Sequence, residues 1–230
     1  MAQRIKTISC RDCTQRDICF RYLSRAQLMK ADEQRLEVIY RPGEILCKQG
    51  TFASHIIYVR KGLVKVYIEG RGKNLILAVV SGGNLIGLTS LFGDAIFHYS
   101  AMAYDHCEVC LIDMQVFKKF ILENASFGSA VIKNLNENTV RSYERIFSMS
   151  KKKIPGRFAD LLIYFSENIF RSPSFALPFS RKELSDLASM SVESLSRIIR
   201  TFNDDDIISV KGRKVHIKNM ELLRKVSDNG

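Results

Sequence analysis

Residues 179–217 have the sequence FSRKELSDLASMSVESLSRIIRTFNDDDIISVKGRKVHI. Ser180 and Glu183 have the S-x-x-E spacing of a capping box, in which each side chain satisfies a free backbone N–H, so we expect a helix to begin after Ser180. Ser191 is a favourable N-cap for a second helix. Lys211-Gly212-Arg213 separates two short apolar runs and predicts a basic hairpin. Two helices joined by a short turn and followed by such a hairpin are typical of a winged helix-turn-helix.

The predicted second helix has a polar face, because Glu193, Ser196, Arg197 and Arg200 recur at helical spacing. An arginine can donate two hydrogen bonds to guanine, a glutamate can accept one from cytosine, and a serine can do either. We therefore predict that Glu193, Ser196 and Arg197 read DNA bases. Basic side chains position a protein on phosphates, a role that we expect for Arg181, Lys182, Arg200, Lys211 and Arg213. The alternative is an ordinary solvated face, on which a Glu–Arg pair four residues apart is common.

The charge of the chain favours a polyanionic partner. The 230 residues carry 35 Lys and Arg against 24 Asp and Glu, a formal net charge of +11. The excess lies at the two ends, because residues 1–30 and 150–230 are basic whereas residues 31–149 are nearly neutral. Such a balance is consistent with nucleic-acid binding.

Some classes of protein are disfavoured by what the sequence lacks. No apolar run approaches the roughly 18 residues that a membrane span needs, and the opening MAQRIKTISCRDC lacks the apolar core of a secretory signal. We therefore expect a cytoplasmic protein with no membrane partner, whose cysteines are reduced thiols or metal ligands. The chain has no Ser-His-Asp order, no H-E-x-x-H and no phosphate-binding glycine loop, so we do not expect an enzyme.

The middle of the chain is rich in strand-forming residues. HIIYVR at 55–60, LVKVYI at 63–68 and LILAVV at 75–80 contain many β-branched and aromatic residues, and glycines separate the runs. This spacing predicts an antiparallel β-roll or sandwich. The expected fold class is α+β, with a cysteine-bearing segment over 1–27, a sensory β-roll over 28–115, a long helix over 116–149 and a winged helix-turn-helix domain over 150–230.

Residues 116–149 contain no proline and a single glycine, and their apolar and small polar positions step by three and four residues. That heptad spacing lets one helix pack along another, so it predicts a dimerisation helix. The expected dimer seam consists of Ile132, Leu135, Thr139, Ser142, Ile146 and Met149. The alternative is a helix that packs this stripe against its own domain.

The order of these parts resembles that of the Crp/Fnr family of bacterial transcription regulators. The resemblance covers nearly the whole chain and rests on Pro42-Gly43-Glu44, the glycines of the roll, LSDLA at 184–188 and SVESLSR at 191–197. It implies a roll like that of cyclic-nucleotide-binding domains, a long dimerisation helix and a winged helix-turn-helix. It also implies double-stranded DNA, a second copy of the chain and RNA polymerase as partners.

The Val-Glu-x-x-Ser-Arg pattern that begins at Val192 resembles the recognition helix of the FNR branch of this family. The branch implies a palindrome of TTGA-type half-sites. By the resemblance, Glu193 and Arg197 face G·C pairs and Ser196 faces a thymine.

Two stretches of the roll depart from the pattern of the family members that bind cyclic nucleotides. Those members carry Gly-Glu-Leu and, further on, Arg-Ser/Thr-Ala, where the glutamate holds the ribose and the arginine neutralises the phosphate. The matching stretches here are Gly87-Leu88-Thr89 and Tyr99-Ser100-Ala101, which lack both the acid and the arginine. Because a buried phosphate without a cation is costly to desolvate, we expect no cyclic nucleotide in this roll.

Cys10, Cys13 and Cys19 form a C-x2-C-x5-C run near the N-terminus. Three thiols so close in sequence can converge on one inorganic core, and a [4Fe–4S] cluster needs four thiolates. The run resembles that of FNR-type iron–sulfur sensors, and local alignment by this resemblance places the fourth ligand at Cys110. The resemblance implies oxygen or nitric oxide as the signal. Arg11, Arg16 and Arg21 lie among the N-terminal cysteines and would favour thiolates.

Other roles for the cysteines stay open at this point. Cys107 is a weaker candidate for the fourth ligand, because it lies three positions before Cys110 and a regular strand would place the two on opposite faces. A structural zinc ion could use Cys10 and Cys13 with Cys107 and Cys110, which would leave Cys19 unused. The cysteines could also be redox-active free thiols or have no role, and the roll could sense haem or another small molecule. Cys47 is expected to be a small buried side chain.

Overall fold

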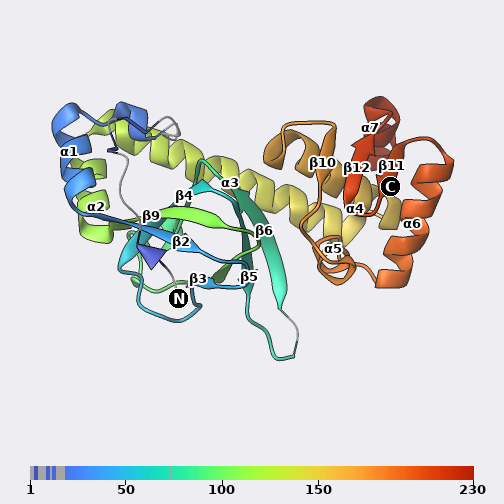
Figure 1. Ribbon diagram of the computed structural model, residues 1–230, viewed down its shortest axis with the longest axis horizontal. Coiled ribbons are helices and arrows are strands. Elements are labelled where there is room, and N and C mark those ends of the chain that lie inside the picture. The colour runs from blue at the N-terminus through green and yellow to red at the C-terminus, as the bar shows by residue number, and fades with distance from the viewer. Residues whose placement is uncertain (1–2, 5–8, 11, 14–18, 73) are drawn as a thin grey trace. The chain divides into compact units, whose positions relative to one another are not determined.

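The computed structural model describes residues 3–4, 9–10, 12–13, 19–72 and 74–230, which form two compact units. The first unit spans Met1–Thr139 and the second spans Val140–Gly230. Each unit is shown with its elements labelled in Figure 1. No helix of the described residues is long and apolar enough to cross a membrane.

The first unit is built on two antiparallel sheets, as the roll prediction requires. One sheet has the order β1 (Gln3–Arg4), β2 (Arg35–Tyr40), β9 (Cys107–Asp113), β4 (His55–Lys61) and β7 (Asn84–Ile86). The other has the order β3 (Ile45–Cys47), β8 (Ser100–Ala103), β5 (Leu63–Ile68) and β6 (Leu75–Ser81). The strands predicted at 55–60, 63–68 and 75–80 are confirmed as β4, β5 and β6.

The core of the roll lies between these sheets and under the helices that follow them. Its side chains include Ile56, Val59, Val64 and Ala101, which are fully or almost fully buried. The turn between β4 and β5 needs a glycine, because Gly62 has φ +98° and an added Cβ would lie 2.7 Å from the Cys107 sulfur. A single-turn helix, η2 (Leu88–Ser90), follows β7.

The N-terminal segment ends in a short 3₁₀ turn, η1 (Phe20–Tyr22), and a helix, α1 (Arg25–Glu33). Ser24 and Gln27 form a capping box that starts α1. The helix therefore runs across residue 27, where the sequence predicted a boundary.

The long helix predicted over 116–149 is interrupted. The structure has α2 (Met114–Glu123) and α3 (Ala125–Lys151) in its place. Asn124 separates them because its backbone is extended (φ −134°, ψ 97°) and its side-chain oxygen accepts the Phe127 N–H at 3.0 Å. The division between the two compact units falls within α3.

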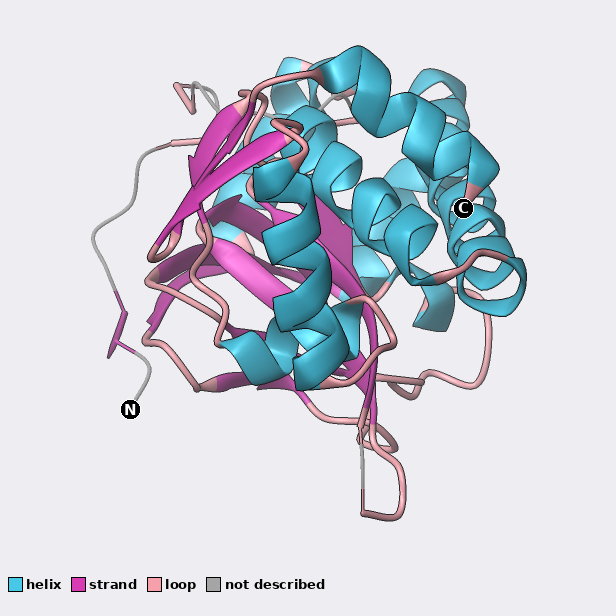
Figure 2. Ribbon diagram, turned by 90° about the vertical axis from the view of Figure 1, so that its right-hand side faces the viewer, coloured by secondary structure: helices cyan, strands magenta, loops and turns pink. Residues whose placement is uncertain are grey.

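The second unit is the predicted winged helix-turn-helix. It begins with α4 (Ile154–Tyr164) and a π-helical turn, η3 (Phe165–Ile169). A three-stranded sheet, ordered β10 (Ser174–Ala176), β12 (Lys214–Ile217) and β11 (Ile208–Lys211), packs with α5 (Arg181–Leu187), α6 (Val192–Asp204) and α7 (Met220–Asn229). Helices make up most of this unit, and its sheet is short (Figure 2). Fully buried Phe165 stacks on Phe179 with ring centroids 5.2 Å apart, which anchors the chain just before α5.

Candidate nucleic-acid interface and cysteine site

The turn between α5 and α6 has the geometry that its sequence predicts. Ser180 and Glu183 form the capping box at the start of α5, and the Ser191 side chain accepts the Ser194 N–H at 3.1 Å at the start of α6. Between the helices, Ser189 has φ +51°, a left-handed conformation that turns the chain. Local hydrogen bonds therefore fix the start of each helix.

The polar face of α6 is open to solvent. Leu195, Ile198, Ile199 and Phe202 are buried, whereas Glu193, Ser196, Arg197 and Arg200 on the other face are exposed. Backbone and Ser191 hydrogen bonds, with the nearby Lys182 charge, lower the pKa of Glu193, so it is an anionic acceptor at neutral pH. The three side chains that we predicted to read bases thus lie on one accessible helix face.

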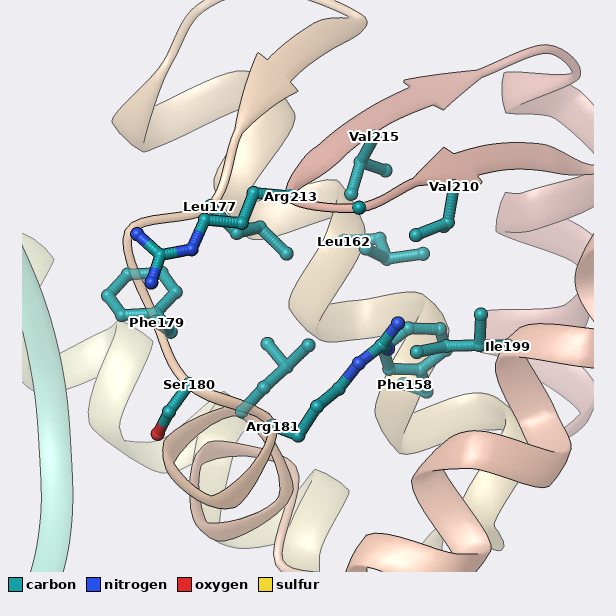
Figure 3. Close-up of a pocket in the computed structure, with 12 residues that line it drawn as sticks. Phe158, Leu162, Leu177, Phe179, Ser180, Arg181, Ile199, Val210, Arg213 and Val215 are labelled. Carbon is teal, nitrogen blue, oxygen red and sulfur yellow. The ribbon is translucent and has the colours of Figure 1, made fainter.

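The hairpin of β11 and β12 forms the wing. Gly212 has φ +61° in its turn, and the Val210 N–H donates to Asn203 Oδ1 at 2.9 Å, which fixes the wing against the end of α6. Arg213 in this turn and Arg181 at the start of α5 both line a hollow of about 230 Å³ (Figure 3). Its remaining lining is largely apolar, with Phe158 and Leu162 from α4.

The other predicted phosphate contacts are also exposed. Lys182 Nζ lies 3.5 Å from Asp186 Oδ1, and Arg200 Nε lies 3.8 Å from Asp204 Oδ2. Exposed pairs of this kind contribute little to stability, so DNA phosphates can compete for these cations. Lys211 is exposed beside the turn of the wing.

An apolar stripe on α3 is exposed in the single chain. Ile132 and Ile146, which we predicted in the dimer seam, are 57% and 61% exposed. Thr139 and Ser142 are also exposed, whereas Leu135 and Met149 are partly buried. Val140, Tyr143 and Phe147 extend the exposed apolar surface beyond the predicted positions.

Two of the predicted cluster ligands lie beside the same arginine. Arg35 Nη1 donates to Cys110 Sγ at 3.2 Å, and Asp32 Oδ1 accepts both the Arg35 Nε–H at 2.9 Å and the Cys10 N–H at 3.0 Å. Burial raises the pKa of the Cys10 thiol to about 12, with Asp32 and Cys110 adding to the rise and Arg35 opposing it. Burial also raises the pKa of Cys110, and Arg35 again opposes this.

Arg35 belongs to a network of buried and half-buried charges on the same face of the sheet. It pairs with Glu37, Glu37 Oε2 lies 3.9 Å from Arg60 Nη2, and Arg60 pairs with Glu108. We missed this network in the sequence. A signal was present, because Arg35 and Glu37 alternate with Leu36 in a strand, so both charged residues share one face.

The remaining cysteines lie elsewhere. Cys19 is 1% exposed in the apolar core, and Cys13 is partly exposed. No three Cys, His, Asp or Glu side chains of the described residues are grouped closely enough to hold a metal ion. Arg11 and Arg16 lie outside the described residues.

Cys107 and Cys110 lie on opposite faces of β9, as the strand period predicts. Cys107 is opposite Tyr40 of β2 and Cys110 is opposite Glu37. The Cys107 thiol donates to the Leu63 carbonyl oxygen at 3.2 Å, away from Arg35. A zinc site that used both thiols would need ligands on opposite faces of β9, so the strand geometry argues against it. Cys47 is 7% exposed, which confirms the expectation of burial.

Aromatic rings connect the cysteine-bearing segment to the start of α3. Phe20, next to Cys19, lies 5.3 Å from the ring of Tyr58 and 6.0 Å from the ring of Phe127. Tyr58 is opposite Cys110 in the sheet, and Phe127 is fully buried in the first turn of α3. The surroundings of Cys19 and Cys110 thus contact the first turn of α3 directly.

The two stretches that differ from cyclic-nucleotide binders are joined to each other. Tyr99 Oη accepts the Gly87 N–H at 2.8 Å, and burial raises the pKa of Tyr99 to about 12. Ser100 is fully buried, donates to Glu69 at 2.5 Å and accepts the Gln49 N–H at 2.9 Å. Internal partners therefore occupy the polar groups of this part of the roll.

Two family models match the chain. One, described as a cyclic nucleotide-binding domain, matches residues 37–124. The other, described as a Crp-like helix-turn-helix domain, matches residues 156–226. Together they cover more than half of the chain.

Curated relatives match almost end to end. The chain is 27% identical to the fumarate and nitrate reduction regulatory protein of Vibrio cholerae, over 98% of this chain and 94% of that protein. It is 25% identical to the transcriptional activator protein anr of Pseudomonas aeruginosa, over 94% of this chain and 93% of that protein. Among solved structures, FixK2 from Bradyrhizobium japonicum has the same fold, with a TM-score of 0.76 at 19% identity over 84% of this chain and 96% of FixK2.

Proposed function

Because the chain belongs to the Crp/Fnr family of DNA-binding transcription regulators, we propose that it binds a palindrome of TTGA-type half-sites through α6. The observation that carries this proposal is the exposed face on which Glu193, Ser196 and Arg197 lie together. Arg197 donates to guanine, Glu193 accepts from the cytosine amine, and Ser196 contacts a thymine.

Phosphate contacts set the register of this helix in the major groove. Arg181 precedes the recognition helix, Arg200 lies at its far end, and Lys211 and Arg213 extend from the wing. With Lys182, these cations supply sequence-independent affinity that decreases as salt increases. RNA polymerase is the further partner of a regulator bound in this way.

A palindrome requires two copies of the chain. We propose that the exposed surface of α3, with apolar Ile146 and Tyr143 beside the small polar Thr139, packs against the same surface of a second copy. Two recognition helices then bind half-sites about 34–36 Å apart. A small change in the packing of α3 alters that spacing and thereby specific binding.

We further propose that Cys10, Cys13, Cys19 and Cys110 hold a [4Fe–4S] cluster. The donor chemistry fits, since four thiols are available and the buried guanidinium of Arg35 lies beside two of them to balance an anionic group. When bound, such a cluster supplies a core that oxygen or nitric oxide can destroy. Because no three ligands are grouped in the described conformation, the cysteine-bearing segment must rearrange to bring all four thiols together.

The signal reaches DNA through the neighbours of Cys19. A shift of Cys19 moves Phe20, whose ring contacts Phe127 in the first turn of α3. The state of the cysteine site thereby changes the packing of α3 and the spacing of the two DNA-reading helices.

The first experiment is a visible spectrum of protein purified without oxygen, with iron and sulfide assays, before and after exposure to air. We expect a broad absorption band at about 400 nm, iron and sulfide in the protein, and bleaching in air. DNA binding to the palindrome is measured on the same samples and should fall when the band fades. Colourless protein without iron would contradict the cluster but leave DNA binding in place.

Base reading is tested separately with Arg197→Ala. It should lose about 1–3 kcal/mol of binding free energy on the TTGA palindrome and discriminate less at the guanine position. Arg213→Ala is the matched control, because loss of a phosphate contact weakens all sequences alike and reduces the salt slope by about one. Unchanged sequence preference in Arg197→Ala would contradict the assignment of α6.

A further inference from the structure

A buried arginine joins two cysteines that lie far apart in the sequence. The Arg35 side chain is 3% exposed, and its Nη1 donates to Cys110 Sγ at 3.2 Å. An arginine remains charged and has only donors, so burying it requires acceptors around it. A cysteine sulfur is a weak hydrogen-bond acceptor, so this contact points to a role for Arg35 other than stabilising the sheet.

Each edge of the guanidinium is directed to a particular partner. Nε and Nη2 both lie 2.9 Å from Asp32 Oδ1, and Nη1 pairs with Glu37 as well as with Cys110. Glu37 and Cys110 are opposite each other in the β2–β9 ladder, so the register of the sheet fixes both contacts. The arginine fork is therefore held in one orientation, with an N–H aimed at the sulfur.

Asp32 extends the arrangement to the N-terminal segment. The oxygen that accepts from Arg35 also accepts the backbone N–H of Cys10 at 3.0 Å. One Asp–Arg pair thus contacts both Cys10 and Cys110, although most of the first unit separates the two cysteines in the sequence.

We propose that Arg35 is a positioning residue of the iron–sulfur site, which donates a hydrogen bond to the Cys110 sulfur while Asp32 holds Cys10 beside it. This inference rests on the proposed function, because it assumes that these cysteines bind a cluster. Hydrogen bonds and positive charge next to cluster sulfurs stabilise the more negative, reduced state. Arg35 therefore raises the reduction potential of the cluster and slows its loss in air. An ion pair that served only the fold would leave both properties unchanged.

The test compares Arg35→Met/Glu37→Gln with Glu37→Gln alone. The double variant removes the arginine together with its buried partner Glu37, so the net charge beside Cys110 equals that of the wild type. Of the partners of Arg35, the half-buried Asp32 keeps its charge and loses this cation. Arg35→Lys is the second variant, because it keeps the pair with Glu37 but has one nitrogen in place of three. Urea unfolding of each metal-free variant shows whether that variant is folded and how stable it is.

The readouts are the midpoint potential of the cluster, its fading in air and iron retention against a chelator. Relative to Glu37→Gln, we expect Arg35→Met/Glu37→Gln to have a more negative midpoint potential, faster fading and iron retention weaker by about 10- to 100-fold. Arg35→Lys should change in the same direction by less. If the folded Arg35 variants match their controls in all three readouts, the role of Arg35 is overturned while the cluster stands. If wild-type protein takes up no iron and sulfide, the iron–sulfur function and this inference are both overturned.

Discussion

The side chain of Asn124 donates a hydrogen bond to the backbone carbonyl oxygen of Tyr22 at 2.9 Å. The same amide group donates to Gln27 Oε1 at 2.9 Å, while its oxygen accepts the Phe127 N–H at 3.0 Å. One residue therefore caps α3 and holds the turn that follows Cys19. This contact joins the start of α3 to the turn that follows Cys19.

Substitution of Asn124 separates these two roles. Asn124→Asp keeps an N-cap acceptor but loses both donor bonds, whereas Asn124→Ala loses the cap as well. We expect Asn124→Ala to lower the free energy of unfolding by about 1–3 kcal/mol, and Asn124→Asp to lower it by less. Urea unfolding measures both. If Asn124→Asp is as stable as the wild type, the bonds to Tyr22 and Gln27 contribute nothing.

The helix-turn-helix was predictable because its signals are local. The capping box of Ser180 and Glu183 and the N-cap at Ser191 act within one helical turn, and both are present. The strands of the roll were predictable for the same reason, since alternation and glycine turns are read within a few residues. The opposite orientation of Cys107 and Cys110 follows from the strand period alone.

The Arg35 network was not predictable, because it depends on the pairing of distant strands. Arg35 and Cys110 are 75 residues apart, and only the β2–β9 register brings them together. The break at Asn124 was missed although its cap on the Phe127 N–H is local. Its donor partners, Tyr22 and Gln27, are about a hundred residues away in the sequence. A search for helical periodicity considers only the apolar positions on either side of Asn124.

The proposed dimer surface is tested by introducing a charged side chain at its centre. Ile146 is 61% exposed in the single chain and is flanked by exposed Tyr143 and Phe147. In Ile146→Glu, each chain would bury a carboxylate at the seam beside the same carboxylate of the second chain. We therefore expect monomers that bind the palindrome weakly. Sedimentation over a range of concentrations gives the oligomeric state.

Gln115→Glu is the control for that experiment. Gln115 is exposed on α2, outside α3, so a carboxylate added there should leave the dimer intact. An Ile146→Glu protein that still sediments as a dimer would show that the chains associate elsewhere.

The turn between α5 and α6 stores a small strain at Ser189. Its φ of +51° is the left-handed conformation, which costs an ordinary residue about 1–2 kcal/mol and costs glycine almost nothing. We expect Ser189→Gly to raise the free energy of unfolding by roughly 0.5–1 kcal/mol, because the gain exceeds the added entropy of the unfolded chain. Ser189→Val should lower it, since a β-branched residue is least suited to this conformation. Equal stability of the two variants would contradict the strain.

Buried thiols make stability depend on alkaline pH. Burial raises the pKa of Cys47 from 9.0 to about 12, so the folded protein keeps a proton that the unfolded chain loses above pH 9. The contribution of this thiol is complete below pH 9 and declines as the pH rises towards 12, by up to about 1.4 kcal/mol per pH unit. Cys47→Ala should therefore flatten the fall in the free energy of unfolding between pH 9 and 11, measured by urea titration. Val66→Ala, another change in the core of the roll, should lower stability without altering this slope, and an unchanged slope in Cys47→Ala would rule out Cys47 as its source.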